Sequence, residues 1–251
     1  MRLAGIARYP VKGLAGEEVE TAVLSPGGPL PHDRRFALVY STTGSGQPSE
    51  DWSEKPQFVG LDHEERLARL GLTYDEESCI VTILRDGKQV ARGKADEALG
   101  RTLLTQFFTA FLKNAPRGAP KFVEAPQAAF SDFDEIYLHL ISRESVADLE
   151  RVARKPVDPR RFRANLIVED LPAWQEFEWI GKRLRIGEAL LEGAEKTERG
   201  SVTTVNPETA ERDLNVPRTL RAGFGHPYMG VYLRVVEGGH IAVGDPLDLL
   251  S

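Results

Sequence analysis

Basic side chains stand at the ends of several predicted strands of this acidic chain. Lys12 follows a Tyr-Pro-Val segment at the end of the first predicted strand, and Arg34 opens another strand after a Pro/Gly-rich loop. Arg163 precedes a further apolar segment, and Arg199 lies in a polar stretch at 195–213. Arginine offers a planar fork, and lysine a point charge, to a phosphate or carboxylate. Each cation taken singly is expected to be a solvated surface charge, whereas the group together makes an anion site a hypothesis.

The stretch at 195–213, EKTERGSVTTVNPETAERD, is the most polar part of the second half of the chain. Its Ser/Thr residues, its Asn-Pro step and its charges of both signs argue against a core element. We therefore expect either a solvated connection or the wall of a site, and the residues alone leave both open.

Composition excludes several classes of protein. The 251 residues are 41% apolar with a net charge of −6, which argues against a general attraction to nucleic acid or anionic membranes. No apolar run approaches the roughly 18–20 residues of a membrane helix, and the N-terminus lacks the apolar core of a secretory signal. The single Cys79 can form neither an internal disulfide nor a cysteine-based metal site. We expect a cytoplasmic protein without nucleic-acid or membrane partners.

Common catalytic motifs are absent from the sequence. It contains no HExxH, Walker A loop, Rossmann glycine fingerprint or GxSxG elbow, and its five histidines show no pair at metal-ligand spacing. His139 is expected to be a structural strand residue, Cys79 a buried thiol in a strand, and residues 223–230 a plain connection. Catalytic residues and metal ligands therefore cannot be assigned, and a hydrolase has no nucleophile–base pair in its favour.

Glycine and proline separate short apolar runs, which is typical of a β-rich protein. Strands are expected within these segments: 3–11, 17–25, 34–41, 79–93, 137–142, 163–169, 183–193, 230–239 and 240–250. Asp86-Gly87 predicts a hairpin turn, and 41–50 a mobile loop. The pattern predicts a mainly β protein with a few helices (α+β) in two units, 1–122 and 123–251, with 115–127 connecting them.

Two helices are expected. The segment 95–114 places six large apolar residues on one broad face: Leu99, Leu103, Leu104, Phe107, Phe108 and Phe111. The segment 142–154 is amphipathic and begins at a cap that is either Ser142 or Ser145.

Several segments in a fixed order resemble the MOSC family, the molybdenum cofactor sulfurase C-terminal domain proteins. YPVKGLAGEEVETAVLSPGGPLPHDRRFALV resembles the family's N-terminal β-barrel domain. RRFRANLIVEDLPAW, TTVNPETAERD and MGVYLRVVEGGHIAVGDPL follow one another as segments of the MOSC domain do. The resemblance covers almost the whole chain and implies a MOSC-type β-barrel plus a smaller N-terminal β-barrel-like domain.

The resemblance also implies a cofactor. The family binds the pterin molybdenum cofactor (molybdopterin), whose terminal phosphate is held by basic, Ser and Asn side chains of both domains. The positions of this sequence that match the family's binding residues are Lys12, Arg34, Ser142, Arg163, Asn165 and Arg199. At the level of the family, molybdenum ion binding and pyridoxal phosphate binding are implied as well.

One departure from the family bears on the metal. The family's Cys-x-Arg-Cys, whose second thiolate ligates molybdenum, aligns its cysteines with Thr197 and Gly200. Glycine offers no ligand atom, and Ser201 or Glu198 are the alternatives nearby. A further change is Gly13, where relatives carry serine after the lysine.

Two functions follow from the resemblance. One is an oxidoreductase acting on N-hydroxylated compounds with an electron-transfer protein as partner, as in the amidoxime reducing components. The alternative is a non-catalytic MOSC-fold module that binds another anionic ligand or a protein partner. Whether the protein is an enzyme is left open by Gly200.

Overall fold

The structure is a computed structural model that describes residues 1–40, 58–113, 117–125, 128–131, 133 and 135–250. The described chain is mainly β with a few helices, as the sequence predicts. Its first half contains β1 (Arg2–Arg8), β2 (Val11–Lys12), β3 (Glu17–Val19), β4 (Thr21–Leu24), β5 (Phe36–Tyr40), the short 3-10 helix η1 (Glu65–Arg69), β6 (Leu70–Asp75), β7 (Ile80–Arg85), β8 (Lys88–Lys94), α1 (Ala98–Phe111) and β9 (Pro120–Glu124). Its second half contains β10 (Leu138–Ser142), α2 (Arg143–Ala153), η2 (Pro159–Phe162), β11 (Leu166–Glu169), η3 (Gln175–Trp179), β12 (Arg183–Ile186), β13 (Ala189–Glu198), η4 (Ser201–Thr204), α3 (Val216–Phe224), β14 (Tyr228–Glu237), β15 (Gly239–Ala242) and β16 (Leu247–Leu250).

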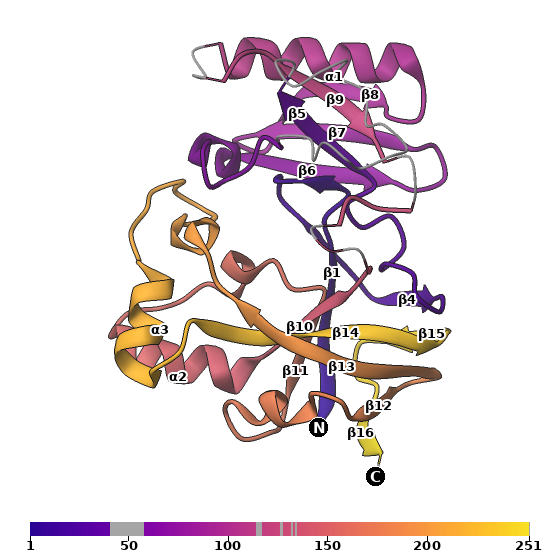
Figure 1. Ribbon diagram of the computed structural model, residues 1–251. Helices are drawn as coiled ribbons and strands as arrows, with labels where there is room; N and C mark the ends of the chain where they lie inside the picture. The colour runs from indigo at the N-terminus through magenta and orange to yellow at the C-terminus, as the bar shows by residue number, and fades with distance from the viewer. Residues whose placement is uncertain (41–57, 114–116, 126–127, 132, 134, 251) are drawn as a thin grey trace.

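The strands form one large sheet and three small ones. The eight-stranded sheet runs β16-β12-β13-β14-β10-β11-β1-β3, so its edge comes from the first 20 residues of the chain. The three-stranded sheets β2-β5-β9 and β6-β7-β8 form a second unit with α1, and β15 pairs with β4. Figure 1 shows the two units stacked, with β1 running up through the large sheet toward the junction. The ends of β1 and β2 therefore lie where the units meet.

The segment 115–127 is not a plain connection. It contains β9, which pairs with β5 so that Phe36 lies opposite Glu124, and it buries Phe122 in the core of the smaller unit. Pro120 occupies the first position of the strand, where a missing N–H is tolerated. The division after residue 122 falls inside β9 and stays a prediction, and the expected loop at 41–50 lies outside the described residues.

The hairpin of β7 and β8 has the turn that the sequence predicts, but Cys79, which precedes β7, does not lie in the strand as expected. Asp86 and Gly87 both have positive φ, 53° and 73°, as a two-residue turn between β7 and β8 requires. Cys79 lies in the turn before β7, half-buried, instead of within a strand. Its sulfur contacts Arg35 Nη1 at 3.4 Å and the Tyr74 hydroxyl at 3.5 Å.

Helix α1 covers the small sheets with a narrower face than the sequence suggests. Leu104 and Phe108 are fully buried, whereas Leu99 and Leu103 are 70% and 47% exposed on the outer side of the helix. No helix among the described residues combines the length and the apolar character needed to span a membrane.

Helix α2 begins at Ser142, which settles the choice between the two serines. The Ser142 Oγ accepts a hydrogen bond from the backbone N–H of Ser145 at 3.0 Å. The Ser145 hydroxyl in turn donates to Glu176 Oε1 at 2.7 Å. Glu176 is 0% exposed, and its Oε2 has no partner in the described part of the chain. Burial therefore raises the pKa of Glu176.

A Glu176→Gln variant is expected to unfold at a higher temperature than the unchanged protein at pH 8. The raised pKa means that the folded state prefers the neutral acid, so stability is lost as pH rises above the value of about 4.3 for an unfolded glutamate. The gain in melting temperature, roughly 2–4 °C for each kcal/mol of added stability, is expected to vanish at pH 4. Thermal melts at both pH values measure it, with the exposed Glu178→Gln as control; equal gains at both pH values would contradict the explanation.

Candidate functional site

A cavity of about 530 Å³ lies between the loops of the two units. Four of the six predicted cofactor-binding residues line it: Lys12, Arg34, Arg163 and Arg199. Two more arginines and two carboxylates complete its charged lining: Arg117, Arg161, Asp62 and Glu198. Cations therefore outnumber carboxylates by six to two in this lining, although the protein as a whole is acidic. We call it the cationic cavity.

Backbone geometry brings two of these arginines together. Arg34 and Arg163 both adopt left-handed backbone, with φ of 50° and 51°, directly before β5 and at the end of η2. Left-handed non-glycine residues are uncommon and occur often at functional sites. The Arg34 backbone N–H donates to the carbonyl of Tyr9 at 2.8 Å, and its guanidinium donates to the carbonyl of Arg163 at 3.4 Å. Arg34 thereby links Tyr9, directly after β1, to Arg163, directly after η2, at the cavity.

Arg199 is 9% exposed and is held by backbone oxygen instead of carboxylate. Its Nε and Nη2 donate to the carbonyl of Met229 at 2.9 and 2.7 Å, and its Nη2 also contacts Nε2 of His139. Burial lowers the pKa of Arg199 to about 10. Within the described residues no carboxylate pairs with it, so its positive charge is not cancelled locally.

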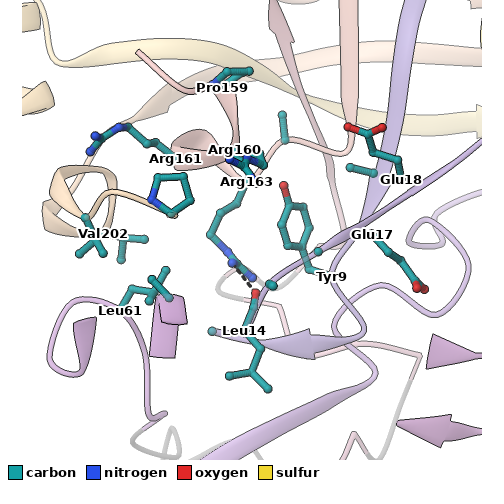
Figure 2. A pocket seen from close by; sticks show the side chains of 18 of the residues that line it. Tyr9, Leu14, Glu17, Glu18, Leu61, Pro159, Arg160, Arg161, Arg163 and Val202 are labelled. Carbon is teal, nitrogen blue, oxygen red and sulfur yellow. Dashed lines mark hydrogen bonds between the residues drawn. The ribbon is translucent and has the colours of Figure 1, made fainter. Parts of the chain in front are cut away.

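Arg163 is held in a similar way. Its Nη1 donates to the carbonyl of Leu14 at 2.6 Å, and its guanidinium lies 4.2 Å from the centre of the Tyr9 ring (Figure 2). Its buried Nη2 has no hydrogen-bond partner in the described chain. Burial lowers the pKa of Arg163 to about 10. A buried cation with an unsatisfied donor is costly unless an anion completes it, so this position favours an anionic ligand.

The charges of Lys12 and Arg34 are stabilised by contacts with other side chains, whereas those of Arg163 and Arg199 have no ion pair in the described chain. Lys12 Nζ lies 4.6 Å from the centre of the Phe58 ring, a cation–π contact. Arg34 forms an ion pair with Asp33. Burial pulls the pKa of Arg34 down, but the Asp33 carboxylate, together with Tyr9 and Tyr232, raises the pKa above its usual value. Arg161 is likewise paired, with Asp213 at 2.5 Å.

Two ring side chains of the cavity were not predicted as site residues. His139, in β10, is 4% exposed, and Tyr232 of β14 lies with its ring centre 5.6 Å away. Burial, and then the charge of Arg199, hold the pKa of His139 well below its usual range. His139 is therefore neutral and accepts a hydrogen bond from Arg199. Only the pairing of β10 with β14 reveals these positions, because an isolated histidine in an apolar strand carries no signal.

Ser142 and Asn165 do not line the cavity. The Ser142 hydroxyl caps α2, as described above. The Asn165 Oδ1 accepts from the backbone N–H of His139 at 3.1 Å, while its Nδ2 donates to the carbonyl of Ala7 at 3.2 Å. Asn165 thus connects β10 to the end of β1 by hydrogen bonds.

Arg117, in contrast, is a cation of the cavity lining that the sequence analysis did not predict.

Gly200, where the family resemblance led us to expect a cysteine, lines the cavity. Its φ of −102° suits any residue, and a Cβ built there would meet no atom within 4 Å. The first residues of the polar stretch, up to Glu198, form the end of β13, and of these only Thr197 is buried. Residues Glu198 to Thr203 form a wall of the cavity, apart from the exposed Ser201.

The side chains near Gly200 are engaged elsewhere. Glu198 pairs with Arg221 at 3.3 Å, and Ser201 does not line the cavity. Cys79 lies in the other unit, outside the cavity lining. Across the described residues, no cluster of three or more His, Cys, Asp or Glu side chains could hold a metal ion. The residues present thus fit the phosphate end of a pterin cofactor, but they supply no thiolate for its metal.

The chain resembles characterised proteins along most of its length. Human (Homo sapiens) mitochondrial amidoxime-reducing component 1 is 28% identical over 289 residues, covering 97% of this chain and 81% of that protein. Rat (Rattus norvegicus) mitochondrial amidoxime reducing component 2 is 28% identical over 138 residues, covering 50% of this chain and 40% of that protein, so the match spans less than half of the rat protein. The crystal structure of the YUAD protein from Bacillus subtilis covers 99% of this chain and 94% of its own, with a TM-score of 0.46 and 12% identity.

Two family models match in the order in which the units occur. The MOSC N-terminal beta barrel domain matches residues 1–114, and the MOSC domain matches residues 127–248. Since the two matches together account for nearly the whole chain, this protein belongs to the MOSC family.

Proposed function

We propose that this protein binds the pterin molybdenum cofactor through its terminal phosphate in the cationic cavity. The observation that carries the proposal is the convergence of Arg163 and Arg199, two buried guanidinium groups that lack carboxylate partners in the described chain. A dianionic phosphate would supply the missing negative charge and accept charge-assisted hydrogen bonds. Lys12 and Arg34 would add positive charge from the other unit.

The same cavity defines what this chain would contribute to a reaction. When bound, the cofactor supplies redox chemistry at molybdenum, and the names of the relatives point to reduction of amidoximes, which are N-hydroxylated compounds. The cavity residues would bind and orient the cofactor and keep His139 neutral beside Arg199. Such a reduction requires an electron-transfer protein as partner, and we propose the cytoplasm as its setting because the chain carries a single thiol.

A Lys12→Ala variant is expected to lower cofactor content about tenfold, because one charge-assisted contact to the phosphate is lost. Molybdenum per protein by elemental analysis and pterin fluorescence after denaturation measure the content, in protein from a host that makes the cofactor. Lys94→Ala is the matched control, since Lys94 is exposed on β8 and pairs with Glu97. Unchanged protein that holds neither molybdenum nor pterin contradicts the proposal.

A second candidate is a non-catalytic binding module with the same anion site. Gly200 is the observation that favours it, since the position facing the cavity carries no ligand atom. The two candidates share the phosphate contacts and differ in whether the remaining site can hold the metal.

A Gly200→Cys variant distinguishes the two candidates. Because a Cβ at position 200 meets open space, we expect its melting temperature to stay within roughly 2 °C of the unchanged protein. Gly193→Cys serves as the control for strain: its Cβ would lie 2.2 Å from the Trp179 carbonyl oxygen, and such overpacking costs about 1–3 kcal/mol. Molybdenum and reduction of an N-hydroxylated substrate that are already present in the unchanged protein, and that Gly200→Cys does not raise, support the oxidoreductase. Bound pterin in the unchanged protein, with metal and activity only in the Gly200→Cys variant, supports the non-catalytic module.

A further inference from the structure

Figure 2 shows the lining of a second cavity, of about 400 Å³. It adjoins the cationic cavity, because the two share lining residues such as Gly13, Leu61 and Val202. Apolar side chains from both units dominate its lining, among them Leu14, Ala68, Ile167 and Val205. It shares Arg163 with the cationic cavity, but Lys12, Arg34, Arg199 and Gly200 do not line it. A volume in this range is typical of pockets for small molecules. We call it the apolar cavity.

One hydroxyl group in the apolar cavity is available to a ligand. Tyr9 is 5% exposed, and the guanidinium groups of Arg163 and Arg34 lie 4.2 and 5.6 Å from the centre of its ring. Its hydroxyl makes no hydrogen bond within the described residues, and Figure 2 shows it pointing away from the Leu14 carbonyl. Burial raises the pKa of Tyr9, so the hydroxyl keeps its proton and can donate it in a hydrogen bond.

Five charged residues line the apolar cavity: Arg160, Arg161, Arg163, Glu17 and Glu18. Glu18 has no ion pair within the described chain, but it is exposed, so water screens its charge. Arg160 pairs with Asp158 at 2.6 Å, and Arg161 pairs with Asp213. Glu17 is taken by Arg8 at 2.7 Å. Arg163 is the remaining buried charge, and its Nη2 lacks a partner in the described chain. A neutral donor and a cation side by side are suited to an anionic oxygen.

We propose that the apolar cavity binds a small carboxylate with an aliphatic body. The carboxylate oxygens accept hydrogen bonds from the Tyr9 hydroxyl and from Arg163, and the aliphatic body lies against Leu14, Ile167 and Val205. This site is separate from the phosphate site of the proposed function, although both use the charge of Arg163. Its ligand is distinguished from the cofactor by a single carboxylate head and by the lack of any need for Lys12 or Gly200.

Three probes with the same eight-carbon body test the proposal: octanoate, octanol and octylamine, titrated by calorimetry into the full chain. We expect octanoate to bind at least tenfold more tightly than the other two. Tyr9→Phe keeps the ring and removes the hydroxyl, so octanoate affinity should fall about tenfold. Ala68→Trp fills the apolar cavity alone and should abolish binding, whereas Ala98→Trp, at an exposed position on α1, should leave it unchanged.

Equal affinities for the three probes, or octanoate binding that survives Ala68→Trp, overturn the proposal. The Lys12→Ala variant separates it from the proposed function, because it should lose cofactor and keep octanoate affinity. If Lys12→Ala weakens octanoate as much as Tyr9→Phe does, the carboxylate occupies the cationic cavity and the separate site is disproved. Octanoate binding by protein that holds no cofactor would leave this inference intact while the proposed function fails.

Discussion

The burial of Arg163 and Arg199 without carboxylate partners is the constraint around which the site is built. Removing a guanidinium from water is costly, and proteins usually offset that cost with an acidic partner. Here the offset comes from carbonyl dipoles, those of Leu14 for Arg163 and of Met229 for Arg199. Dipoles hold a guanidinium in place without cancelling its charge. The field of both arginines therefore stays directed into the cationic cavity, which a paired arginine such as Arg161 could not achieve to the same degree.

The position of Arg163 depends on both units, because the carbonyl that accepts from it belongs to Leu14, which packs in the core of the smaller unit. Arg163 reaches the Leu14 carbonyl across 149 residues of sequence. Arg212 provides a second link by donating to the carbonyls of Leu61 and Asp62, both at 2.9 Å. The pairing of β1 with β3 within the large sheet fixes both ends of the segment that contains Leu14. The walls of both cavities are therefore held together by backbone acceptors and by ion pairs between the units, Arg212 with Glu65 at 3.4 Å and Arg8 with Glu76 at 2.6 Å.

The sequence predicted local structure well because local chemistry determines it. Asp86-Gly87 supplies the positive φ values of its turn, and the short apolar runs become strands wherever a partner strand covers them. Strand β9 escaped prediction because glycine and proline flank it and its stability comes from pairing with β5, which lies about 80 residues earlier. Which side chains meet at the cavity also depends on contacts between residues far apart in the sequence. Family matching placed Ser142 and Asn165 beside the arginines, yet the nearest backbone groups take up their hydrogen bonds, at the start of α2 and between β10 and β1.

Glycine at position 200 is not required by the backbone. A φ of −102° is open to every residue, and the space around the absent Cβ is free, in contrast to Gly193, which packs against the Trp179 carbonyl. The contacts of Arg163 and Arg199 also do not depend on a side chain at position 200, since their partners are carbonyls, His139 and the rings of Tyr9 and Phe162. A residue without a ligand atom at position 200 therefore leaves the electrostatics of the cavity intact. The proposed anion binding and a metal ligand at position 200 are thus physically separable in this structure.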